Sequence, residues 1–188
     1  MSHARIIVGI SGASGAILGI RLLERLRSLE YEIHLIISES AKKTIRLETD
    51  FSIEEVIALA DVSYDNQDIG ARISSGSFAT KGMVIVPCSI KSLSAVANSY
   101  TADLISRAAD VTLKEGRPLL LVVRETPLHL GHIRLMLKAA EIGVIIFPPV
   151  PAFYTRTASV DELVMNLVGR ILLRFGIENQ DYHEWQGG

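Results

Sequence analysis

The sequence predicts a three-layer α/β fold built around a central, mostly parallel β-sheet. Short apolar runs alternate with helical patterns along the 188 residues, and strands separated by helices pair in parallel through right-handed crossovers. The run at residues 83–86 is apolar without interruption, which is typical of a strand buried on both faces. The composition does not shift and no linker divides the chain, so we expect a single domain over residues 1–188.

The apolar runs predict five strands, at residues 6–10, 32–37, 83–86, 119–123 and 144–147. The second and fourth of these are apolar over most of their length, as strands of a parallel sheet are. The third should end at Pro87, because proline has no N–H to donate to a strand ladder.

Helical patterns are expected between the strands, at residues 16–27, 52–60, 92–97, 101–115 and 159–176. Capping signals support several of their ends. Ser-x-x-Glu sequences that begin at Ser52 and Ser159 have the form of capping boxes. Gly116 and Gly176 are natural stops for the helices that precede them.

Composition and charge argue against several classes of function. The net charge is −2 and basic residues do not cluster, so there is no electrostatic footprint for nucleic acid. No apolar run is long enough to cross a bilayer, and the first residues lack the apolar stretch and cleavage site of a signal peptide. A single cysteine allows no internal disulfide and suits a reducing compartment, so we expect a cytoplasmic location.

Polar or rigid segments follow all five predicted strands. They lie at residues 11–15, 38–40, 87–89, 124–127 and 148–154. Because the carboxyl ends of parallel strands share one edge of the sheet, these segments should converge there. The sequence therefore predicts a ligand site at this edge.

The segment Gly9–Gly15 places a glycine-rich turn between a strand and a helix start. Such a turn brings backbone N–H groups and the helix dipole toward a phosphate. A tight strand-to-helix turn without a ligand would have the same sequence pattern. It is neither a P-loop nor a G-x-G-x-x-G motif. The second strand ends in Ser38, which favours a mononucleotide, whereas Glu39 leaves NAD open as a weaker possibility.

Four basic residues are candidates for a role, namely Arg107, Lys114, Arg124 and Arg170. Arg124 ends a buried strand at the ligand edge, where its guanidinium could bind a phosphate with two hydrogen bonds. Arg107 and Lys114 lie seven residues apart on one helix face, and periodicity alone favours a solvated face with ordinary ion pairs. Tyr154 follows a stiff proline-rich segment and could equally be a hydrophobic plug.

The sequence does not predict a metal site or a thiol nucleophile. His129 and His132 are three residues apart, but no third ligand accompanies them. No aspartate cluster is present to hold Mg²⁺ on a diphosphate. Cys88 at a strand end is more typical of packing than of catalysis.

Taken in order, these motifs resemble the UbiX-type flavin prenyltransferases, formerly described as aromatic-acid decarboxylases. The resemblance runs from Ile6 to Trp185, with one departure at Gly116, where the family often has arginine. The motifs that carry it are GISGASGA (9–16), LETD (47–50), SSGSF (74–78), GMVIVPCS (82–89), RAADVTLKE (107–115), RETPL (124–128), PPVPAFY (148–154) and the Gly169–Arg170 helix.

The resemblance implies a flavodoxin-like subunit in a homododecamer of trimers, with FMN bound at subunit contacts. The second substrate would be dimethylallyl monophosphate, and the product, prenylated FMN, would pass to a UbiD-type decarboxylase. Implied FMN contacts are Gly12, Ala13, Ser14, Ser38, Ser89, Ile90, Lys91, Ser92 and Arg124. Implied contacts of the prenyl phosphate pocket, some from a neighbouring chain, are Tyr154, Arg170, Glu48, Arg107, Lys114 and Glu125.

Two other functions remain as alternatives. A flavin-dependent cysteine decarboxylase of the same fold would use a histidine ahead of the third strand, and residues 35–128 contain none. A passive flavin carrier would leave Arg124, Arg170 and Tyr154 without a role. A direct aromatic-acid decarboxylase is the older description of the family, which we interpret as the partner's reaction.

Overall fold

The computed structural model describes residues 4–187 and contains a six-stranded, all-parallel sheet in the order β3-β2-β1-β4-β5-β6. Residues 1–3, on which the expectation about a signal peptide partly rests, lie outside the described residues. The strands are β1 (Arg5–Ile10), β2 (Glu32–Ile37), β3 (Val62–Tyr64), β4 (Met83–Cys88), β5 (Leu119–Val123) and β6 (Ile145–Ile146).

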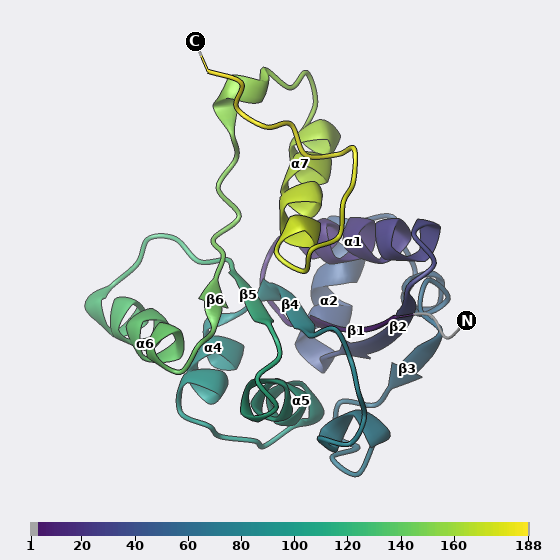
Figure 1. Cartoon of the computed structure of the whole chain (residues 1–188), viewed down its shortest axis with the longest axis vertical. Coiled ribbons are helices and arrows are strands. Elements are labelled where there is room, and N and C mark those ends of the chain that lie inside the picture. Colours follow the sequence, from purple (N-terminus) through teal and green to yellow (C-terminus); the bar gives the residue numbers. More distant parts are fainter. Residues whose placement is uncertain (1–3, 188) are drawn as a thin grey trace.

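Helices cover both faces of the sheet, as the three-layer prediction requires (Figure 1). One face packs against α1 (Ala16–Ser28), α2 (Glu39–Glu48), α3 (Ile53–Ile57) and α7 (Val160–Leu173). The other packs against α4 (Ile90–Ala97), α5 (Leu104–Lys114) and α6 (Leu130–Glu141). Two 3₁₀ turns, η1 (Arg72–Ser74) and η2 (Phe153–Thr155), complete the elements.

The five strands expected from the sequence are all present, and without β3 their spatial order is 2-1-3-4-5, which is the flavodoxin order. The chain runs from β1 outward to β2 and β3, and then returns to the other side of β1 as β4. This reversal makes a switch point between β1 and β4. In open α/β sheets, ligands bind outside the carboxyl ends of the strands at such a point.

Besides the two 3₁₀ turns, one strand and two helices were not predicted, and each of these three buries few side chains. Strand β3 has only three residues and lies at the sheet edge. Helix α2 buries only Ala41 and Ile45. Helix α6 buries only Ala139, while Leu130, Ile133 and other apolar residues of that helix are exposed.

The prediction that the third strand ends at Pro87 was wrong. Strand β4 continues through Pro87 to Cys88, and its pairing register with β5 shifts between Ile85 and Cys88. The peptide bond before Pro87 is cis. An irregular register lets a residue without an N–H stay inside a strand, because the regular ladder is interrupted there.

Helix boundaries differ from the predictions by a few residues. Helix α4 begins at Ile90 rather than Ser92, and α5 begins at Leu104 rather than at residue 101, because Ser89 and Asp103 act as their N-caps. The capping box at Ser52 is confirmed. At the start of α7 the Ser159 hydroxyl accepts from the Glu162 N–H, but the Glu162 carboxylate accepts from the Ala158 N–H rather than from the Ser159 N–H.

Between residues 4 and 187, none of the helices combines the length and the apolar character that a membrane span requires. The longest, α7, has 14 residues. A bilayer-spanning helix needs about 20 apolar residues.

Candidate active site

The largest cavity near the switch point has a volume of about 850 Å³ and lies outside the carboxyl ends of β1, β2 and β4. Hydroxyl and amide side chains make up much of its wall. The residues that were predicted to bind the cofactor and that line it are Gly12, Ser38, Ser89, Lys91 and Ser92. The loop after β3 and the start of α5 complete the wall, through Asn66, Gln67, Asp103, Ile105 and Ser106.

The hydroxyl of Ser11 ties the two sides of the switch point together. It donates to the Pro87 carbonyl at 2.9 Å and accepts from the Ser89 N–H at 2.8 Å. Ser11 is only 2% exposed, so these bonds are made away from water. The turn after β1 and the start of α4 are therefore held at a fixed separation, which positions the cavity between them.

The turn after β1 is also pressed against the start of α2. A Cβ added at Gly12 would lie 2.3 Å from the Cβ of Ser40, so only glycine fits at this position. Ser38, at the end of β2, is the N-cap of α2 and accepts a hydrogen bond from the Ala41 N–H. Glu39, which left NAD open as a ligand, forms an ion pair with Lys42.

The N-terminus of α1 binds a carboxylate of the protein itself. The N–H groups of Gly15 and Ala16 donate to Glu48 Oε2 at 2.7 and 3.3 Å. Partial burial raises the pKa of Glu48, but hydrogen bonds from Gly15, Ser14 and Ala16 and the charge of Arg124 together place that pKa below its ordinary value. Two of the amides that the sequence pattern assigned to a phosphate are thus engaged by Glu48.

Helix α4 presents its first turn to the same cavity. Its N-cap, Ser89, accepts from the Ser92 N–H at 3.3 Å, and the two hydroxyls lie 3.2 Å apart. Lys91 is exposed on this turn and lines the cavity. A helix N-terminus with a nearby lysine and hydroxyl groups can bind a phosphate.

Arg124 and Glu125 follow β5 and are both exposed. Among residues 4–187, the Arg124 guanidinium has no hydrogen-bond or ion-pair partner, although, after the hydrogen bonds from Gly15, Ser14 and Ala16, its charge also lowers the pKa of Glu48. The Glu125 carboxylate accepts from the Thr126 N–H at 3.0 Å. Both residues therefore lie at the predicted edge, outside the wall of the 850 Å³ cavity.

Arg107 and Lys114 lie on α5 and pair with neighbouring acids. Arg107 is 3.2 Å from Asp110, and Lys114 is 2.9 Å from Glu115. The ordinary ion pairs expected from helical periodicity are thus present. Within residues 4–187 these two cations line neither the cavity at the switch point nor the one described next.

The C-terminal tail runs back along α7, the helix that carries Arg170, and contacts Tyr154 (Figure 1). The Tyr154 hydroxyl lies 3.2 Å from the His183 carbonyl, and its ring packs edge-on to Trp185 at 5.3 Å. A hydrogen bond with Tyr182, partial burial and nearby acid raise the pKa of Tyr154, and the charge of Arg170 opposes this.

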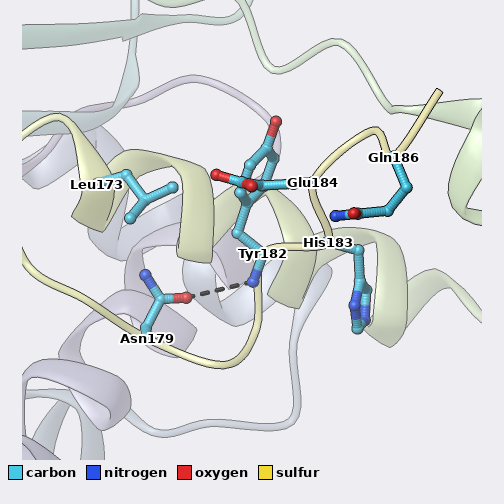
Figure 2. Close-up of a pocket in the computed structure, with 6 residues that line it drawn as sticks. All are labelled: Leu173, Asn179, Tyr182, His183, Glu184 and Gln186. Atoms are coloured by element: carbon cyan, nitrogen blue, oxygen red, sulfur yellow. Dashed lines mark hydrogen bonds between the residues drawn. The ribbon is translucent and has the colours of Figure 1, made fainter.

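A second cavity, of about 590 Å³, lies beside this tail. Figure 2 shows that Asn179, Tyr182, His183, Glu184 and Gln186 of the tail surround it together with a residue of α7. Asn179 fixes the tail, because it donates to the Gly169 carbonyl at 3.0 Å and accepts from the Tyr182 N–H at 3.2 Å. A Cβ at Gly169 would lie 2.6 Å from the Asn179 amide oxygen, which explains glycine next to Arg170.

Sequence reasoning missed Asn66, which joins the loop after β3 to α5. Its side chain accepts from the Ile105 N–H at 3.0 Å and donates to Asp103 at 3.3 Å. Asp103 and Ser106 form a capping box, and this Asp-x-x-Ser spacing was a signal that could have located the helix start. No local pattern marks Asn66 itself.

Comparison with known proteins places the chain in a family. Residues 1–172 match the model of the Flavoprotein family. The flavin prenyltransferase UbiX of Escherichia coli K12 is 60% identical over 186 residues, which cover 97% of this chain and 98% of that protein.

Two solved structures agree with this match. A crystal structure of AnUbiX (PadA1) in complex with FMN and dimethylallyl pyrophosphate has a TM-score of 0.98 at 48% identity, with full coverage of both chains. A dodecameric, FMN-dependent UbiX-like decarboxylase from Escherichia coli O157:H7 has a TM-score of 0.95 at 48% identity, covering 97% of this chain and 100% of that one.

The sheet order, the switch-point cavity and the family match define a flavoprotein of the flavodoxin-like class. Identity of 60% over nearly the whole chain narrows this class further. The chain belongs to the UbiX family of flavin prenyltransferases.

Proposed function

We propose that this chain joins the dimethylallyl group of dimethylallyl monophosphate to N5 and C6 of reduced FMN. The product, prenylated FMN, is then used by a UbiD-type decarboxylase. The observation that carries the proposal is the cavity of about 850 Å³ at the switch point of a chain that is 60% identical to a flavin prenyltransferase. Its volume suits a cofactor, since such sites span roughly 300–1,000 Å³.

FMN binds in this cavity, with its phosphate at the first turn of α4. Ser89, Ile90, Lys91 and Ser92 supply hydroxyls, amides and a positive charge there. Gly12, Ala13, Ser14, Ser38 and Arg124 provide the remaining contacts. The engagement of the α1 amides by Glu48 supports α4 as the anion site, because a second anion at α1 would meet a carboxylate.

The prenyl phosphate binds at a second anion site. Tyr154 and Arg170 form one part of this site. Glu48, Arg107, Lys114 and Glu125 complete this site, some of them from a neighbouring chain of a homododecamer. Two observations support an assembly: a relative from Escherichia coli O157:H7 is dodecameric, and α6 exposes Leu130, Ile133 and Leu137. Apolar residues in such a row are typical of a covered surface.

The chain's own residues act by orienting the two substrates and by holding charge. When bound, reduced FMN would supply N5, which loses its proton to the departing phosphate as it bonds to the allylic carbon and the carbon–oxygen bond breaks. It would also supply C6, which bonds to the dimethyl-substituted alkene carbon and loses its proton while the other alkene carbon gains one. Arginine and lysine side chains stabilise the charge that grows on the departing phosphate. The aromatic rings of Tyr154 and Trp185 shield the allylic carbon from water and stabilise its positive charge.

The test is the mass of the flavin recovered after anaerobic incubation with reduced FMN and dimethylallyl monophosphate. We expect a gain of one dimethylallyl unit, and recovery of unmodified FMN alone would contradict the proposal. The unpaired Cys88 supports a reducing compartment, and we place the reaction in the cytoplasm.

A further inference from the structure

The segment 74–78 (SSGSF) has no role in the site described above, yet it is held firmly against the end of α5. Phe78 is buried, and its ring lies between the guanidinium groups of Arg5 and Arg72, at 4.7 and 4.6 Å from the ring centre. This packing anchors one end of the segment. The rest of it crosses the C-terminus of α5.

Arg117 fixes the segment from the other side. The Gly116 N–H bonds the Leu113 carbonyl and the Arg117 N–H bonds the Thr112 carbonyl, which is the Schellman arrangement at a helix end. Gly116 has a φ of +67°, a conformation that glycine adopts without strain. Glycine at position 116, where the family often has arginine, therefore suits the backbone conformation found there.

From this cap, the Arg117 side chain reaches two carbonyls of the segment. Its Nη1 donates to the Phe78 oxygen at 2.7 Å and its Nη2 donates to the Gly76 oxygen at 2.8 Å. Arg117 is half-buried. Only the planar fork of arginine can make both bonds at once, so lysine would not replace it.

The clamped segment lies directly against the Lys114–Glu115 ion pair. A Cβ built on Gly76 would be 2.0 Å from Glu115 Oε1 and 3.0 Å from Lys114 Nζ. The backbone of Gly76 does not have a positive φ, so glycine is needed here for space rather than for conformation. The segment thus packs closely against both charged groups.

We propose that Gly76 and Arg117 are positioning residues that set the place of the Lys114 ammonium in the prenyl phosphate pocket. The inference rests on the proposed function, in which Lys114 contacts that phosphate. A lysine has a flexible four-carbon stem, and its contribution to a transition state depends on where its charge is held. Gly76 leaves room for the Lys114–Glu115 ion pair, and Arg117 holds segment 74–78 in place beside it.

Gly76→Ala tests the inference without disturbing the backbone, because the added methyl meets the mobile end of the Glu115 side chain. We expect kcat/KM for dimethylallyl monophosphate to fall about ten- to a hundredfold, with FMN affinity within about twofold of wild type. Gly70→Ala is the matched control, since a Cβ there would meet only the Asp68 carboxylate, at an ordinary 3.4 Å.

A double-mutant cycle distinguishes positioning of Lys114 from general damage. In a Lys114→Met background, Gly76→Ala should cause no further loss, because the ammonium whose position the displaced Glu115 carboxylate would alter is already absent. Equal losses in both backgrounds would overturn the inference. So would a Gly76→Ala variant with the same kcat/KM as wild type.

Arg117→Lys is a second, independent variant, with Arg27→Lys as its control because Arg27 also donates to a carbonyl, that of Ala58 at 2.7 Å. We expect Arg117→Lys to lower kcat/KM and Arg27→Lys to leave it unchanged. If the wild-type chain makes no prenylated flavin, the proposed function fails and this inference falls with it. If the wild type is active while Arg117→Lys and Gly76→Ala match it, only the positioning role is wrong.

Discussion

The carboxylate of Glu48 accepts a hydrogen bond of 2.7 Å from the Gly15 N–H, across 33 positions of sequence. It therefore occupies the helix N-terminus that a glycine-rich turn usually offers to a phosphate. The same carboxylate senses the charge of Arg124. Glu48, the last residue of α2, thus links that helix to the turn after β1. In our proposal it belongs to the prenyl phosphate site.

The stability of the Glu48→Gln variant should depend less on pH in the acidic range than that of wild type. The pKa of Glu48 is lower in the folded chain than its ordinary value, so its contribution is complete above the ordinary pKa and is lost as pH falls through the lower, folded value. The variant should melt below wild type at neutral pH, and the gap should narrow toward about pH 3. Thermal melts of both proteins across this range check it, and a constant gap would contradict it.

Ser11→Ala should weaken both the fold and the flavin site. The partly buried Ser89 N–H loses its acceptor, which costs about 1 kcal/mol in the free energy of unfolding. FMN affinity should fall because the turn after β1 is no longer tied to α4. Ser28→Ala is the control, since its hydroxyl also bonds a carbonyl but at an exposed position. Urea unfolding and FMN titration measure the two effects, and equal behaviour of both variants would count against this account.

EDTA should leave turnover intact. Cationic side chains supply the charge that a metal would provide on the leaving phosphate, so we expect no dependence on Mg²⁺. Within residues 4–187, no group of three histidine, cysteine or acidic residues is placed to hold a metal. Activity that is lost in EDTA and restored by Mg²⁺ would show that a metal site exists.

FMN should bind more tightly than NAD. The acid that a dinucleotide site places on the ribose is Glu39 in this chain, and Lys42 already pairs with it. Ser38, which follows β2, lines the cavity. Titration of the apoprotein with both ligands gives the order directly, and tighter binding of NAD would contradict it.

The strands were predictable because their burial leaves a local signature. Residues 32–37 and 119–123 are apolar runs of the length of a strand, and both match the observed bounds. Helix α6 exposes Leu130, Ile133 and Leu137, so the pattern of its apolar residues does not report contact with the core. Half of the residues of helix α2 are charged, and it buries only Ala41 and Ile45.

The site was predictable only in part, because only some of its residues are marked by a local sequence pattern. Ser38 and Ser89 follow strands, and strand ends define the ligand edge. The contacts of Glu48 with Gly15 and of Asn66 with α5 join segments more than 30 residues apart, and no periodicity marks them. The roles of Arg107 and Lys114 come from family resemblance alone, since in a single chain both simply pair with acids.

The most direct test of the two-site account compares flavin occupancy with product formation in three variants. Arg170→Ala and Tyr154→Phe should retain FMN while prenylation slows by about a hundredfold, the order expected when a group that stabilises transition-state charge is removed. Ser14→Asp should expel FMN, because it adds a second carboxylate beside Glu48 on the turn whose residues Gly12, Ala13 and Ser14 contact the flavin in our proposal. Visible spectra give the occupancy and mass spectrometry gives the product. Loss of FMN from Arg170→Ala together with its retention by Ser14→Asp would contradict the division into two anion sites.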